Sequence, residues 1–117
     1  LNNLCYQKAM ANVVLQLALD QCEESLRLEP GAAHVLDSRG TVYLQMGRYK
    51  DAKTDFDSAL AKSPQLESSL MGRAIAKLHL GDAAGARADV AEARKLDTNA
   101  VDHYRSQGFT VPAQLAT

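Results

Sequence analysis

Residues 33–64 read AHVLDSRGTVYLQMGRYKDAKTDFDSALAKSP, and this stretch decides the fold. Its first part carries apolar side chains at helical spacing and ends at Gly47, since glycine adopts the left-handed conformation that terminates helices without a Cβ penalty. A second apolar pattern, with intervals of three or four residues, runs from Tyr49 to Leu60 and ends at Pro64. The stretch therefore predicts two helices joined by a short turn, an antiparallel helical hairpin.

The same pattern recurs at an interval of 34 residues. The residues that keep this interval are Pro30 and Pro64, Gly47 and Gly81, Arg39 and Arg73, Asp55 and Asp89, and Ala18, Ala52 and Ala86. Repeated units of this kind stack so that neighbouring hairpins share one continuous core. The sequence therefore predicts an all-α protein.

A glycine in the middle of the first predicted helix needs a packing reason. Gly40 costs about 1 kcal/mol relative to alanine in a helix interior. We expect the paired helix to cross there with its backbone close by, and Ala52 and Ala59 to supply the small facing surface.

This hairpin resembles a tetratricopeptide repeat (TPR). The positions that match the family pattern are Leu36, Gly40, Tyr43, Gly47, Tyr49, Ala52, Phe56, Ala59 and Pro64, with Leu36 where the family usually has tryptophan. The resemblance implies a right-handed α-solenoid of three TPR helical hairpins plus a C-terminal capping helix. It also implies a non-catalytic scaffold that binds a protein or peptide.

We expect a single domain over residues 1–117. Its predicted parts are a degenerate repeat at about 1–30, repeats at about 33–64 and 67–97, a capping helix at about 98–107 and a tail at 108–117. The first repeat lacks a turn glycine, and Asn12 is expected to take that role because asparagine tolerates the left-handed region. The tail is expected to dock through Phe109 and Val111.

The resemblance implies a concave groove lined by the first helix of each hairpin, suited to an extended peptide or an amphipathic helix. We expect an apolar centre at Leu44, Met71 and Ile75. The predicted groove residues are Asn3, Gln7, Met10, His34, Asp37, Ser38, Thr41, Leu44, Gln45, Ser68, Met71, Ile75 and His79.

One well-known TPR subclass grips the C-terminal carboxylate of heat-shock chaperones with lysine, asparagine and arginine at set groove positions. Those positions hold Asn3, Gln7, Ser38, Ser68 and Gly72 here, and none carries the positive charge that pairs with a carboxylate. We therefore expect a different kind of partner.

Two cysteines, Cys5 and Cys22, lie equally far from the turn expected near Val13 and Val14. Such positions face each other across antiparallel helices, which a disulfide requires. Two buried free thiols are the alternative. A bridge would favour an exported or periplasmic compartment; otherwise the sequence leaves the location open.

Other functional classes find little support. With a net charge of −1 and no basic face, the chain does not suit nucleic acid, and no apolar run is long enough to span a membrane. His34, Asp37 and Ser38 are neighbours on one helix, which cannot easily form a hydrolytic triad. The three histidines do not pair at metal-binding intervals and no carboxylate arrangement completes a site, so we expect neither metal nor cofactor.

A second hypothesis concerns the chain's context. The sequence begins at Leu1, so we expect a processed protein or a piece of a longer one. The domain would then self-associate, or position a catalytic region that lies outside this sequence.

Overall fold

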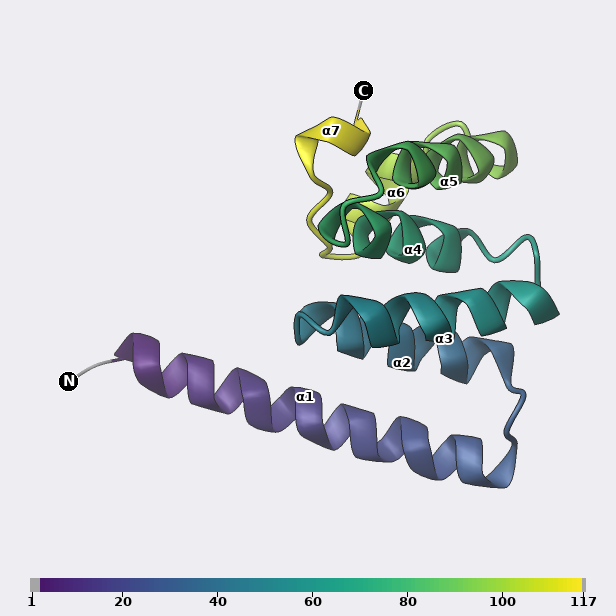
Figure 1. Cartoon of the computed structure of the whole chain (residues 1–117). Coiled ribbons are helices and arrows are strands. Elements are labelled where there is room, and N and C mark those ends of the chain that lie inside the picture. The colour runs from purple at the N-terminus through teal and green to yellow at the C-terminus, as the bar shows by residue number, and fades with distance from the viewer. Residues whose placement is uncertain (1–2, 117) are drawn as a thin grey trace.

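The computed structural model describes residues 3–116, with side chains from residue 11 onward. Within that range every regular element is a helix, which confirms the all-α prediction. Figure 1 shows the helices stacked side by side in chain order, with the N-terminal helix at one end and the C-terminal helices at the other. The helices are α1 (Asn3–Leu28), α2 (Ala33–Gln45), α3 (Tyr49–Lys62), α4 (Glu67–His79), α5 (Ala83–Leu96), α6 (Ala100–Ser106) and α7 (Ala113–Ala116).

Two helical hairpins form the centre of the stack. α2 packs against α3, α4 packs against α5, and α3 joins the hairpins by packing on α4. Helices α2 and α4 end at the predicted glycines. Gly47 and Gly81 adopt the left-handed conformation, with φ of +78° and +91°. The amide after each glycine donates back to a carbonyl five residues earlier, as in Arg48 N to Tyr43 O at 2.8 Å. This is the hydrogen bond that closes a Schellman C-cap.

The ring of Phe56 fills the space beside the mid-helix glycine. Phe56 is 0% exposed, and a Cβ added to Gly40 would lie 2.8 Å from its ring. A Cβ added to Gly72 on α4 would also overlap the ring. Gly40 therefore makes room for an aromatic side chain of α3, whereas we expected a close backbone approach opposite Ala52 and Ala59. Both alanines are fully buried nearby in the core.

The first unit differs from the sequence prediction. Instead of a hairpin that turns at Asn12, residues 3–28 form one continuous helix, α1. The physical reason is local, because the stretch around Asn12 contains neither glycine nor proline and nothing else there stops a helix. The second half of α1 packs on α2, through Leu19 against Val42 and Tyr43 and through Leu26 against Leu36.

The continuous helix also removes the proposed disulfide. Cys5 and Cys22 are 17 positions apart in α1, so their Cα atoms lie about 25 Å apart at 1.5 Å per residue. A disulfide needs Cα atoms within about 7 Å. Cys22 is a free, partly buried thiol, while the side chain of Cys5 lies outside the described residues. The argument for an exported compartment therefore no longer holds.

The C-terminal segment folds back on the third hairpin. α6 ends before Gly108, which has φ of +95°, and packs on α4 and α5. As expected, the tail docks through Val111, which is buried, and through Phe109, whose ring stacks on Tyr104 with centroids 4.7 Å apart. Leu115 of α7 joins the same core.

No helix within residues 3–116 combines the length and the apolar character needed to cross a bilayer.

Candidate partner-binding groove

The first helices of successive units, α2, α4 and α6, lie next to one another. Asp37 of α2 accepts hydrogen bonds from two serines of α4, at 2.9 Å from Ser68 Oγ and 2.6 Å from Ser69 Oγ. Charge-assisted bonds of this kind are stronger than neutral ones. They fix the spacing of α2 and α4 at the start of the candidate groove.

A hollow of about 250 Å³ lies toward the C-terminal ends of α2 and α4. The His79 ring stacks on Tyr49, with centroids 4.1 Å apart and planes within 1°. The tail forms another wall through Gly108, Phe109 and Thr110. The complete lining is Leu44, Gln45, Tyr49, Ile75, His79, Tyr104, Gly108, Phe109 and Thr110.

The structure leaves many of the predicted groove residues accessible. Among them, His34, Ser38, Gln45 and His79 are exposed, and Asp37, Thr41, Leu44 and Ser68 are partly buried. Asn3, Gln7 and Met10 lie where side chains are outside the described residues, so their groove role stays a prediction.

Two predicted groove residues are core residues instead. Met71 is 0% exposed and Ile75 is 6% exposed. Both belong to a core cluster that also contains Val101, Val111 and Leu115 from α6, the tail and α7. The expected apolar centre at Leu44, Met71 and Ile75 is therefore reduced to Leu44 and an edge of Ile75. The tail was expected to dock through Phe109, but its contribution of an apolar surface to the groove was not predicted.

Two of the three catalytic candidates on α2, Ser38 and Asp37, make side-chain hydrogen bonds outside a triad. Ser38 Oγ donates to the backbone carbonyl of His34, at 3.0 Å, as serines inside helices often do. The Asp37 carboxylate accepts from α4, as described above. A hydrolytic triad needs the histidine side chain between the serine and the acid, and these three residues do not adopt that arrangement.

No protein-family model matches the chain. Among solved structures, the first TPR of Spaghetti (RPAP3), bound to the HSP90 peptide SRMEEVD, matches with a TM-score of 0.73 and 20% identity, covering 87% of this chain and 85% of that one. The first TPR domain of human RPAP3 matches with a TM-score of 0.72 and 18% identity, covering 87% and 83%. This chain has a TPR fold. At these identities the likeness establishes the fold alone.

The chain also matches a curated protein in sequence. U-box domain-containing protein 70 of Oryza sativa subsp. japonica is 25% identical over an alignment of 143 residues, which covers 91% of this chain. The match spans 17% of the length of the rice protein.

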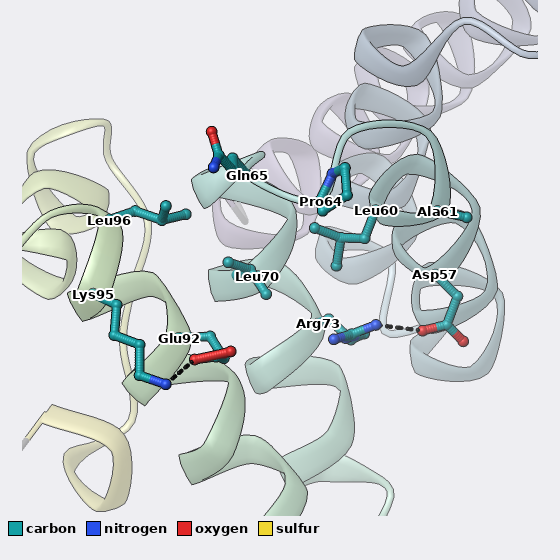
Figure 2. Close-up of a pocket in the computed structure, with 10 residues that line it drawn as sticks. All are labelled: Asp57, Leu60, Ala61, Pro64, Gln65, Leu70, Arg73, Glu92, Lys95 and Leu96. Atoms are coloured by element: carbon teal, nitrogen blue, oxygen red, sulfur yellow. Dashed lines mark hydrogen bonds and ion pairs between the residues drawn. The ribbon is translucent and has the colours of Figure 1, made fainter.

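The chain has a larger hollow of about 550 Å³ between the second helices of its two hairpins. Figure 2 shows that it lies between α3, α4 and α5, with Leu60, Leu70 and Leu96 among its walls. Its charged groups are already paired, Arg73 with Asp57 at 3.0 Å and Lys95 with Glu92 at 2.8 Å. A ligand there would have to compete with these pairs, so the hollow near Gln45 is the better candidate.

A further cluster of polar side chains lies beside α6 of the TPR domain. Glu67, Asp97 and His103 come together, although the sequence indicated no carboxylate arrangement beside a histidine. Burial, and then the neighbouring Asp97 carboxylate, raise the pKa of Glu67 above its usual value. The sequence pattern missed this cluster because its members come from α4, the α5–α6 loop and α6, which only the packing of the capping helix brings together.

Tyr104 lies next to this cluster with its hydroxyl buried. The Tyr104 side chain is 4% exposed, and its hydroxyl has no hydrogen-bond partner among the described residues. Burial, with a smaller effect of the Asp37 charge, raises the pKa of Tyr104 well above its usual range. The hydroxyl therefore stays protonated and remains available as a donor.

Proposed function

We propose that this TPR domain is a non-catalytic scaffold that binds a short protein segment in the hollow around Gln45 and His79. The observation that carries the proposal is the hollow itself. Residues of α2, α3, α4, α6 and the tail line it, and the exposed polar side chains of Gln45, His79 and Thr110 stand beside apolar and aromatic surface. Binding sites typically combine apolar and aromatic surface with a few placed polar groups.

The lining indicates the chemistry of the partner. With His79 neutral, no lining residue carries a formal charge. Leu44 and Phe109 offer apolar contact, and the Gln45 amide can both donate to and accept from a peptide backbone. We therefore expect a segment anchored by an uncharged apolar or aromatic side chain, and not by a terminal carboxylate or an acidic run.

The comparisons support the class of partner and not its identity. The Spaghetti (RPAP3) TPR in one matching structure is bound to a peptide of HSP90. The groove positions of this chain that would pair with a carboxylate hold no lysine or arginine, so the proposal is limited to a peptide or helix of different chemistry.

Selection from a displayed random-peptide library, followed by fluorescence anisotropy with the selected peptide, tests the proposal. Gln45→Lys and His79→Glu each place a charge in the hollow at an exposed position. We expect each to weaken binding at least about tenfold, which is 1.4 kcal/mol. Ser58→Glu on the exposed side of α3 is the matched control. Equal weakening by Ser58→Glu, or none by the other two, would reject the hollow as the binding site.

A second candidate function, self-association, is favoured by one observation on α1. Val13, Val14 and Leu17 are 51%, 58% and 57% exposed on consecutive turns of this helix. α1 is about 39 Å long against about 20 Å for α2, and Figure 1 shows its N-terminal half running past the hairpin stack. A clustered exposed apolar surface often marks an interface.

The proposed occupant of that surface is α1 of a second copy. Light scattering after size exclusion would then report a dimer that Leu17→Glu converts to a monomer, while peptide binding near Gln45 stays unchanged. A wild-type chain that is monomeric at every concentration would reject self-association and leave the peptide proposal standing.

A further inference from the structure

Three potential metal ligands from three separate segments meet beside the first turn of α4. Glu67 begins α4, Asp97 follows α5 and His103 lies on α6. Their ligand atoms all lie within 4.8 Å of one another. His103 Nδ1 is 3.5 Å from Glu67 Oε1 and 3.4 Å from Asp97 Oδ2.

These separations match the spacing of ligands around a metal ion. Zn²⁺ binds histidine nitrogen and carboxylate oxygen at about 2.0–2.2 Å, and tetrahedral ligands at such lengths stand about 3.4 Å apart. Imidazole together with carboxylates is a ligand set that suits Zn²⁺. We propose that Glu67, Asp97 and His103 form a Zn²⁺ site whose fourth position is open to water.

The groups behind two of the ligands hold them in suitable orientations. Asp97 Oδ1 accepts the backbone N–H of Asn99 at 2.9 Å, which leaves Oδ2 facing His103. On the other side of the imidazole, Nε2 lies 3.5 Å from the Gln107 side-chain amide. Turning that amide over would let its oxygen accept the Nε2–H, and Nδ1 would then be free to bind the metal.

A hollow next to the three ligands leaves room for a water molecule. It measures about 210 Å³ and is lined by Leu66, Glu67, Ser68, His103, Tyr104 and Gln107. Water in this hollow could occupy the open fourth position of the metal.

The site would fasten the capping helix to the third hairpin. Glu67 belongs to that hairpin, Asp97 to the loop that leaves it and His103 to α6. An ion that binds the folded chain and not the unfolded one stabilises the fold in proportion to its occupancy. We therefore expect Zn²⁺ to raise the melting temperature of the chain and to protect the α6 amides from hydrogen exchange.

Titration calorimetry with zinc chloride tests the proposal on the full chain after removal of any purification tag. Wild type should bind one Zn²⁺ per chain. Glu67→Gln and His103→Asn, which keep these side chains polar, should each weaken binding at least about tenfold, the lower end of the effect of groups that merely support a ligand. His79→Asn changes another exposed histidine and should bind like wild type.

Several results would overturn the site. Wild type could show no saturable binding, or Glu67→Gln could bind as tightly as wild type. Substitution with Co²⁺ gives a third readout, because thiolate-to-cobalt absorption would place the metal on a cysteine and contradict the assignment. Absorption typical of a nitrogen and oxygen ligand set, lost in His103→Asn, would support it.

Discussion

Arg39 of α2 and Asp55 of α3 are joined by two hydrogen bonds, 2.7 Å from Arg39 Nε to Asp55 Oδ2 and 2.8 Å from a terminal guanidinium nitrogen to Oδ1. Exactly one repeat later, Arg73 makes the same pair with Asp89, at 2.9 and 2.8 Å. Both aspartates are buried. Each hairpin therefore has its own bidentate ion pair between its first and second helix. Arginine provides this geometry and lysine does not.

Breaking one of these pairs should destabilise the fold strongly. Asp55→Ala leaves the partly buried guanidinium of Arg39 without its carboxylate partner, and we expect a loss of about 2–4 kcal/mol in the free energy of unfolding. This is near the range for a broken buried pair, and the partial exposure of Arg39 keeps it from being larger. Chemical denaturation measures the loss.

Two variants make this prediction specific. Asp51→Ala breaks the exposed pair with Arg48 and should cost less than about 1 kcal/mol. Replacing both Arg39 and Asp55 by methionine and leucine should cost less than Asp55→Ala alone, because no unpaired charge remains. If the double variant is the less stable of the two, the ion pair is not the source of the effect.

The glycines around Phe56 should resist replacement by alanine. Gly40→Ala would gain up to about 1 kcal/mol in helix propensity, but its methyl group would press on a ring that also lies close against Gly72. Overpacking of this kind costs about 1–3 kcal/mol, so we expect a net loss in thermal stability. A stabilised Gly40→Ala protein would contradict this packing.

A smaller side chain at position 56 should relieve the overpacking that Gly40→Ala causes. Phe56→Leu alone leaves a cavity and is expected to destabilise the chain. Added to Gly40→Ala, it should cost less than it does in wild type, and the difference is the coupling energy of a double-mutant cycle. Strict additivity would show that the two residues do not compete for space.

Asp57 should contribute stability that depends on pH. Burial alone would raise the pKa of Asp57, but hydrogen bonds from Lys53 and Arg73 outweigh it and hold the pKa below the usual value. For a carboxyl group whose folded-state pKa is lowered, the stabilisation is complete above the unfolded-state pKa of about 3.8 and is lost as the pH falls through the lower, folded-state value.

Denaturation of wild type and Asp57→Asn at a series of pH values measures this effect. The stability difference between the two should be largest at neutral pH and should shrink below about pH 3.8. A difference that stays constant down to pH 2 would show that the Asp57 charge is not responsible.

Both cysteines should be free thiols. Burial raises the pKa of the Cys22 thiol, so the folded chain should react slowly at this position. Under non-reducing denaturing conditions, mass labelling should add two alkyl groups per chain. A fully oxidised monomer with no reactive thiol would contradict the continuous α1.

Much of the fold could be predicted because its signals are local. Gly47 and Gly81 mark turns through a conformation that glycine adopts most easily. The 34-residue interval of Arg39 and Arg73 reflects a contact that each hairpin makes within itself. Gly108 ends α6 for the same reason as the other two glycines.

The sequence predictions that failed concern contacts between residues of different units. The α1 prediction extended the repeat pattern to a segment without a turn residue near Asn12. Met71 and Ile75 were placed in the groove by analogy with α2, yet α6 and the tail cover that part of α4. Glu67 and His103 are 36 positions apart and meet only because the capping helix packs across α4. Local periodicity carries no information about such long-range packing.

Amide chemical-shift mapping of the isotope-labelled chain with a selected peptide tests the central claim most directly. The account predicts that the amides of Gln45, His79 and Thr110 shift, while those of Ser58 and Leu96 do not. Shifts concentrated instead on Gln65, Glu92 and Leu96, around the hollow in Figure 2, would place the partner between the second helices of the hairpins and contradict the account.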